Sequence, residues 1–285
     1  MISFKKYSDI STKVAKKLKL SKDKALELIV KAQQKGYDPL KWQRNLSILT
    51  TMSAEYDPEI KEKTMSDKIN VLLTSFKQFY KYKYNPTISV SEKVEEILKD
   101  SNIINISTKV MQCKYSTIKE EVYDLYNSNP DIILSLGLGA SRTSLNLESI
   151  AQNEYNSIAP DNDGVIMNGN PIIQNGNNLI NTLNLKNLEL LSNKHVSSAI
   201  SDNAGKFMCN ANFYWNQHKI NNENLNTKYL FIHIPFTDEY IGKEPILANE
   251  DLPILSEKGI VNAIVNILEE LSKQINDSKI SEIKI

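Results

Sequence analysis

From Ile69 onward, short apolar runs typical of buried strands alternate with longer stretches typical of helices. The strand candidates are rich in β-branched residues, as expected for strands covered by helices on both faces. They are residues 69–76, a segment that begins at Ile103, and residues 131–136, 196–200 and 229–234. This alternation predicts an α/β fold, a three-layer α/β/α sandwich with a mostly parallel central sheet.

Helix candidates lie between and after these strands. They are residues 91–98, 116–126 and 143–154, a helix that begins near Cys209, and a long closing helix over residues 257–274. Residues 168–187 are rich in asparagine, so no element is predicted for them.

The first 67 residues differ from the rest because they show no strand-like alternation. Ser21 is predicted to cap a helix that ends at Gly36. The apolar side of that helix consists of Ala25, Leu28, Ile29 and Ala32. Two more helices are expected to begin at the Asp-Pro pairs 38–39 and 57–58. The sequence thus predicts a helical N-terminal extension over residues 1–67 and an α/β domain over residues 68–285.

The charge of the chain is zero overall but uneven along its length. Of 34 basic residues, residues 1–44 hold 12, against 4 of the 34 acidic residues. A basic segment is compatible with an acidic partner, a nucleic acid or a membrane surface. The solvated face of lysine-rich helices is the simpler explanation. We therefore expect no nucleic acid and no membrane among the partners.

The sequence lacks the marks of membrane-spanning and secreted proteins. No window approaches 18 consecutive apolar residues, and the lysine-containing start has no apolar stretch of the signal-peptide kind. Two cysteines, Cys113 and Cys209, are too few for a disulfide framework. We therefore expect a cytosolic protein in a reducing environment.

Cys209 is the first candidate for chemistry. It lies where the strand candidate 196–200 runs through a glycine-containing loop, SDNAGKFMC, into a predicted helix. The positive end of a helix dipole favours the thiolate, which is the nucleophile of cysteine hydrolases. On the local sequence alone, a buried and inert cysteine is the simpler interpretation.

His233 ends the apolar strand candidate 229–234 and can face the same crevice as Cys209. A base in that position would take the thiol proton and return it to the leaving amine. A satisfied core histidine fits the same pattern. His195 and His218 offer no better pairing, and three scattered histidines without an HxxxH or HExxH pattern predict no metal site.

A glycine-containing turn, GLGASR, follows the strand candidate 131–136 and ends at Arg142. The turn matches neither the GxGxxG pattern nor a phosphate-binding loop, so it gives little support to nucleotide binding. Arg142 is one of two arginines in the chain, which indicates a need for its planar fork of donors. A structural pairing with a carboxylate explains it equally well.

Together these three segments resemble the pyroglutamyl peptidase I (pyrrolidone-carboxylate peptidase) family of cysteine peptidases. The family motif SDxAGxFxCN is matched by SDNAGKFMCN, which places the nucleophile at Cys209. The motif F(I/V)HIP is matched by FIHIP, which places the general base at His233. SRTSLNLE matches the segment from the arginine to the third catalytic residue, Glu148, and PDNDG matches the PDN(E/D)G that follows. The resemblance covers about residues 68–274.

The resemblance implies a mechanism that needs no metal and no organic cofactor. Cys209 would attack the amide carbonyl after an N-terminal pyroglutamyl residue and form an acyl-enzyme. His233 would shuttle the proton, and Glu148 would orient the imidazole and stabilise its charge. The implied partners are peptides with an N-terminal pyroglutamate, and family members also form homo-oligomers.

The resemblance also implies a binding site for the lactam ring. Family members hold that ring between aromatic side chains, and the matching positions are Phe76, Phe79 and Phe207. Read alone, Phe76 and Phe79 fit equally well as loop residues that pack on the core.

The sequence departs from the family pattern at two places. The glycine-rich GFDPFGG loop reads SFKQFYK over residues 75–81, and the loss of glycines restricts the backbone there. The arginine of ARIPDN is replaced by Ile158. If that arginine stabilises developing oxyanion charge, its loss costs on the order of 100–1,000-fold in rate.

These departures leave alternatives to the pyroglutamyl peptidase interpretation. One is an amidase that acts on another N-terminal group through an altered pocket. The other is a catalytically weakened protein that acts in binding or regulation through its basic helical segment.

Overall fold

The computed structural model describes residues 4–34, 41, 49 and 68–282. The chain divides into two compact units, Met1–Lys68 and Ile69–Ile285. Gly36 and the helices predicted to begin at residues 38–39 and 57–58 lie outside the described residues.

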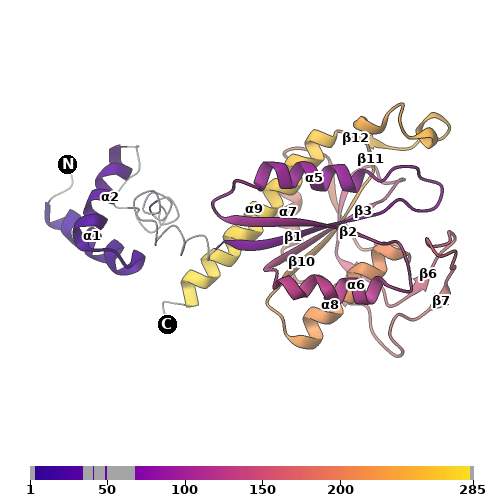
Figure 1. Ribbon diagram of the computed structural model, residues 1–285, viewed down its shortest axis with the longest axis horizontal. Helices are drawn as coiled ribbons and strands as arrows, with labels where there is room; N and C mark the ends of the chain where they lie inside the picture. The colour runs from indigo at the N-terminus through magenta and orange to yellow at the C-terminus, as the bar shows by residue number, and fades with distance from the viewer. Residues whose placement is uncertain (1–3, 35–40, 42–48, 50–67, 283–285) are drawn as a thin grey trace. The chain divides into compact units, whose positions relative to one another are not determined.

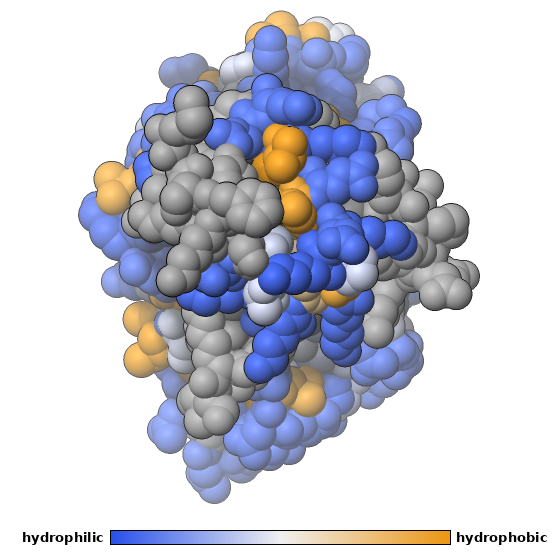
Figure 2. Space-filling view, turned by 90° about the vertical axis from the view of Figure 1, so that its left-hand side faces the viewer, coloured by the Kyte–Doolittle hydropathy of each residue, from blue (hydrophilic) through white to orange (hydrophobic). Residues whose placement is uncertain are grey.

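The first unit contains helices α1 (Phe4–Leu18) and α2 (Lys22–Gln34). The Oγ atom of Ser21 accepts a hydrogen bond from the backbone N–H of Lys24 at 3.3 Å, which confirms the predicted cap. A small apolar core consists of Ile10, Val14, Ala15, Ala25, Leu28, Ile29, Ala32 and Leu49. Lysines 13, 16, 19, 22 and 24 are exposed. On the face of the molecule shown in Figure 2, hydrophilic side chains predominate and hydrophobic ones form small separate spots.

The second unit is built on a six-stranded sheet in the order β2-β1-β3-β10-β4-β9. Its strands are β1 (Ile69–Phe76), β2 (Ile104–Met111), β3 (Ile132–Leu138), β4 (Leu145–Glu148), β9 (Ser198–Ser201) and β10 (Lys228–Ile234). The helices of this unit are α5 (Pro86–Leu98), α6 (Ile118–Leu125), α7 (Leu185–Ser192), α8 (Met208–Glu223) and α9 (Glu257–Glu282).

Short elements complete the second unit. Three two-stranded pairs join β5 (Ile150–Ala151) to β8 (Leu179–Ile180), β6 (Tyr155–Asn156) to β7 (Asn168–Asn170), and β11 (Phe236–Thr237) to β12 (Ile254–Leu255). The 3-10 helices are η2 (Tyr126–Ser128), η3 (Asp238–Tyr240) and η4 (Pro245–Ala248).

The sheet is mostly parallel and lies between two layers of helices. Strands β2, β1, β3 and β10 run parallel to one another, β4 runs antiparallel to β10, and β9 runs parallel to β4. Helices α5, α7 and α9 cover one face, and α6 and α8 cover the other (Figure 1). The predicted three-layer α/β/α sandwich is thus confirmed.

Alternation along the central strands decides which side chains face which layer. In β3 and β10, Leu134 and Ile232 contribute to the core under α5, α7 and α9. Ile133 and Phe231 contribute to the core under α6 and α8. Because successive residues point to opposite faces, His233 also faces the α6 and α8 layer.

Most of the predicted elements are present, with shifts of a few residues at their ends. Helix α5 begins five residues before its predicted start because Asn85 caps it: Asn85 Oδ1 accepts the N–H of Thr87 at 3.2 Å, and Pro86 occupies the first turn. Helix α9 extends to Glu282, beyond its predicted end. Helix α7, which begins at Leu185, was not predicted.

The predicted helix over residues 143–154 is wrong. Residues 145–148 form strand β4 and residues 150–151 form strand β5. The sequence LNLE alternates with a period of two, and Leu145 and Leu147 fill the core under α5, α7 and α9. Four alternating residues are too few to stand out along the sequence, and their strand conformation depends on pairing with β10 and β9.

Candidate active site

Cys209 is the second residue of α8, so the predicted helix start is confirmed. The thiol is partly exposed, and it lies in the first turn, at the positive end of the helix dipole. Strand β9 leads into this helix, but it runs antiparallel to β10. The loop after β9 therefore reaches the site from the opposite direction to the loops that follow β3 and β10.

Gly137 makes room for the sulfur of Cys209. A Cβ atom at Gly137 would lie 2.8 Å from Cys209 Sγ and 2.7 Å from Phe231 Cζ. The sulfur therefore lies directly over β3. In the sheet register Gly137 is the neighbour of His233, so the thiol lies over the strand next to the one that carries the imidazole.

Replacing Gly137 by alanine should displace the sulfur. We expect kcat/KM to fall about 100-fold, because a misplacement of about 1 Å at a reacting atom has that effect. Overpacking should also lower the free energy of unfolding by about 1–3 kcal/mol. Peptidase assays, iodoacetamide labelling of Cys209 and urea unfolding check the prediction. Unchanged labelling and turnover would show that the sulfur does not need this space.

His233 and Glu148 form a buried pair. His233 Nδ1 lies 2.7 Å from Glu148 Oε1, and the Glu148 side chain is completely buried. Since a carboxylate only accepts hydrogen bonds, Nδ1 carries the proton and donates it. This leaves Nε2, the other ring nitrogen, as the atom that can exchange a proton with a neighbouring group.

The environment of His233 favours the protonated imidazole. Burial lowers the pKa of His233, but the negative charge of nearby Cys209 and the hydrogen bond to Glu148 raise it more. The charge of Glu148 acts in the same direction, and the pKa rises to about 9. The arrangement therefore stabilises the imidazolium form of His233.

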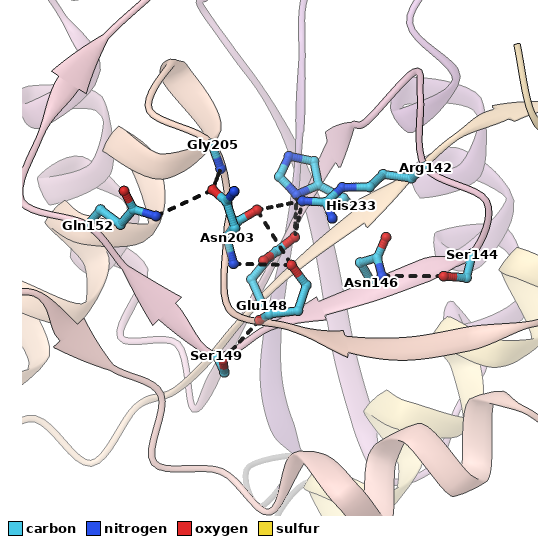
Figure 3. A network of polar contacts seen from close by, with 10 residues as sticks. Arg142, Ser144, Asn146, Glu148, Ser149, Gln152, Asn203, Gly205 and His233 are labelled. Atoms are coloured by element: carbon cyan, nitrogen blue, oxygen red, sulfur yellow. Dashed lines mark hydrogen bonds and ion pairs between the residues drawn. The ribbon is translucent and has the colours of Figure 1, made fainter.

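Arg142 joins this group. Its Nη2 lies 3.4 Å from Glu148 Oε1 and donates to the backbone carbonyl of Asn203, in the loop that leads to Cys209. Figure 3 shows Arg142 and His233 converging on the Glu148 carboxylate. The second carboxylate oxygen, Glu148 Oε2, is buried and has no hydrogen-bond partner among the described residues.

Two of the three predicted lactam-binding residues lie together. The rings of Phe79 and Phe207 are 5.8 Å apart, and Phe207 comes two residues before Cys209. Tyr115, which no sequence signal indicated, packs edge-on against Phe207 at 5.8 Å. Phe76 is instead 2% exposed, and its ring lies 6.5 Å from that of Phe231, within the core.

The described part of the chain offers no metal site and no membrane span. In it, no three or more His, Cys, Asp or Glu side chains form a group that could hold a metal ion. None of the helices described there is both long and apolar enough to cross a bilayer.

Comparison with known proteins decides the family. A sequence model described as pyroglutamyl peptidase matches residues 69–274. This chain belongs to the pyroglutamyl peptidase family. The pyrrolidone-carboxylate peptidases of Thermosipho africanus and Brachyspira hyodysenteriae are 26% and 29% identical to it. These matches cover 73% and 70% of this chain, and 100% and 98% of the two relatives.

Solved structures of the family have the same fold. The pyrrolidone carboxyl peptidase of Fervidobacterium islandicum is 30% identical, with a TM-score of 0.64 over 72% of this chain and 99% of that one. A mutant pyrrolidone carboxyl peptidase from Pyrococcus furiosus is 24% identical, with a TM-score of 0.66 over 73% of this chain and 100% of that one. The residues before Ile69 lie outside the family match.

The loop that lacks the family's glycines is anchored to another part of the second unit. Tyr80 has a φ of 56°, a left-handed conformation that costs a non-glycine residue about 1–2 kcal/mol. Anchors to the segment around η4 oppose this cost: the N–H of Tyr84 donates to Glu244 Oε2 at 2.8 Å, and Lys81 lies 2.5 Å from Glu250. Contacts with a distant part of the chain thus hold this loop in place.

Ile158, the other departure from the family pattern, is fully exposed, at 100%. It belongs to a loop held by Asp161, which accepts hydrogen bonds from the N–H groups of Tyr115 and Val165, both at 2.8 Å. Asn162 Nδ2 also donates to the carbonyl of Gln78 at 3.0 Å. The loop therefore contacts both segments that carry the aromatic rings beside Phe207.

Proposed function

We propose that this protein is a cysteine peptidase that hydrolyses the amide bond after an N-terminal pyroglutamyl residue. Cys209 is the nucleophile, His233 the general base and acid, and Glu148 the residue that orients the imidazole. The observation that carries the proposal is the position of the Cys209 sulfur over Gly137, beside an imidazole that is bound at 2.7 Å to a buried carboxylate.

The reaction proceeds in two steps. The Cys209 thiolate attacks the carbonyl carbon of the pyroglutamyl residue, and the resulting tetrahedral intermediate breaks its C–N bond. His233 protonates the departing amine from Nε2, which leaves pyroglutamate on the sulfur as a thioester. His233 then takes a proton from a water molecule, the water attacks the thioester, and the thiol and free pyroglutamate are released.

Two aromatic rings provide the binding site for the lactam in this proposal. Phe79 and Phe207 are partly exposed, and their rings lie 5.8 Å apart at an interplanar angle of 41°, close to Cys209. Their faces offer an apolar surface to the flat lactam ring. Phe76 contributes from the core by supporting Phe231, which packs against His233 at 5.0 Å.

Fluorophore release tests the proposed substrate. We expect the full-length protein to release aminomethylcoumarin from its pyroglutamyl derivative and not from its prolyl derivative. The two acyl groups share a five-membered ring, but proline lacks the lactam carbonyl. Equal turnover of both would contradict lactam recognition, and turnover of neither would contradict the proposed substrate.

The pH dependence of kcat/KM should report His233. Because the pKa of His233 is raised from 6.5 to about 9, the imidazole remains protonated at neutral pH and loses its proton near pH 9. Leaving-group protonation fails above that pH, so we expect kcat/KM to decline with an apparent pKa near 9 that belongs to the Cys209–His233 pair. A decline centred near 6.5 would show an unperturbed histidine.

One observation favours a second candidate, an amidase that acts on another N-terminal group with the same three residues. The loop around Phe79 differs from the family pattern, because Tyr80 is in a left-handed conformation and the N–H of Tyr84 is bound to Glu244. Assay of aminomethylcoumarin derivatives with other N-terminal acyl groups separates the two candidates, since the second requires one of them to be hydrolysed faster than pyroglutamyl.

A further inference from the structure

Arg142 is held close to the proposed catalytic residues by a tight turn after β3. Its backbone N–H donates to the carbonyl of Gly139 at 2.8 Å. A Cβ atom at Gly139 would lie 2.6 Å from Arg142 Cγ and 3.3 Å from His233 Cβ. The arginine stem therefore runs over Gly139 and beside His233, and only a residue without a side chain fits beneath it.

The guanidinium group joins two elements that must be aligned for catalysis. It contacts the carboxylate of Glu148 at the end of β4 and the carbonyl of Asn203 in the loop before α8. That loop is tied further, because Asn203 Oδ1 accepts the N–H of Gly205 at 3.0 Å and the amide of Gln152 at 3.3 Å (Figure 3). Arg142 thus links the position of Cys209 to that of Glu148.

Arg142 also balances the charges of the proposed catalytic residues. The reactive state holds a Cys209 thiolate, a His233 imidazolium and a Glu148 carboxylate, which together carry one net negative charge. His233 is 5% exposed and Glu148 is fully buried, so water screens this excess poorly. The guanidinium of Arg142 brings the sum to zero, and its side chain is only 30% exposed.

We propose that Arg142 is a positioning residue that neutralises the buried catalytic group and fixes the Cys209 loop against Glu148. The role rests on the proposed function, because it assumes that Cys209 reacts as a thiolate. This role differs from that of an ion pair that only stabilises the fold, because it predicts that the pH dependence of Cys209 alkylation changes when Arg142 is replaced.

The test is the rate of Cys209 alkylation by iodoacetamide across the range from acidic to alkaline pH, with the labelled peptide identified by mass spectrometry. Loss of the nearby Arg142 cation disfavours the Cys209 thiolate and favours the His233 imidazolium, so the pKa values of Cys209 and His233 should both rise in the variant. We expect Arg142→Met to shift the profile upward by about one pH unit and to slow alkylation at neutral pH about 10-fold. Arg142→Lys restores the charge but not the planar fork, so it should recover the profile and only part of kcat.

Lys206→Met is the matched control. Lys206 is a cation of the same loop, but it pairs with Glu154 at 2.7 Å on the surface. This variant should keep the profile of the unmodified protein. An unshifted profile in folded Arg142→Met, or the same shift in Lys206→Met, would overturn the proposal. If Arg142→Met does not fold, a Lys variant with a shifted profile would overturn it. A Cys209 that is inert in the unmodified protein would overturn the proposed function itself, and this role with it.

Discussion

Cys209→Ala is expected to lower kcat/KM for pyroglutamyl-aminomethylcoumarin by about 10⁴-fold or more. The residues of a catalytic group act as a unit, and loss of its nucleophile removes most of the chemical acceleration. The other cysteine cannot substitute for it. Cys113 is 2% exposed, and burial raises the pKa of its thiol, so it remains protonated at the pH of the assay.

Cys113→Ala is the matched control for this experiment. It removes a sulfur atom from the core under α6 and α8, so it should lower the thermal midpoint and leave turnover near that of the unmodified protein. Circular dichroism checks that both variants are folded. Residual turnover in Cys209→Ala within about 10-fold of the unmodified protein would rule out a thioester at this residue.

The second large effect is expected from Ile158→Arg. If the family arginine at this position stabilises oxyanion charge, its return should raise kcat by about 100-fold or more, with a smaller change in KM. The substitution should cost little stability, because Ile158 is fully exposed and packs against nothing. Steady-state kinetics and a thermal unfolding curve test both parts of the expectation.

Ile166→Arg provides the control for Ile158→Arg. Ile166 belongs to the same loop and is 48% exposed, so the substitution adds the same charge in another place. An equal gain in both variants would indicate general attraction of the substrate. No gain from Ile158→Arg would mean that the oxyanion depends on other donors, such as the N–H groups in the first turn of α8.

Sequence patterns predicted the sheet well where strands are long and buried. Ile69–Phe76 was predicted to the residue, since an apolar run of that length has few other conformations open to it. The prediction for strand β4 was wrong for the opposite reason. This strand has four residues and owes its conformation to β10 and β9, which come later in the chain. The resemblance could assign a role to Glu148, but it could not show that Glu148 lies on a strand.

The site shows a similar division. The motifs proposed Cys209 and His233 as partners, but the place of the sulfur over the strand next to His233 depends on Gly137, which the sequence presented only as part of a turn. Phe76 and Phe79 are three residues apart and looked equivalent. They separate in the structure because Phe76 is the last residue of β1 and points into the core, whereas Phe79 lies in the loop beyond it.

The place of β10 between β3 and β4 has a consequence for the biosynthesis of this protein. Ribosomes make β3 and β4 long before β10, so their facing edges stay unpaired until residue 234 has emerged. Open strand edges are templates for aggregation. The proposed catalytic histidine also lies on β10, so the nascent chain lacks its proposed general base until β10 has been made. A chain terminated before residue 228 would therefore be both inactive and prone to aggregate.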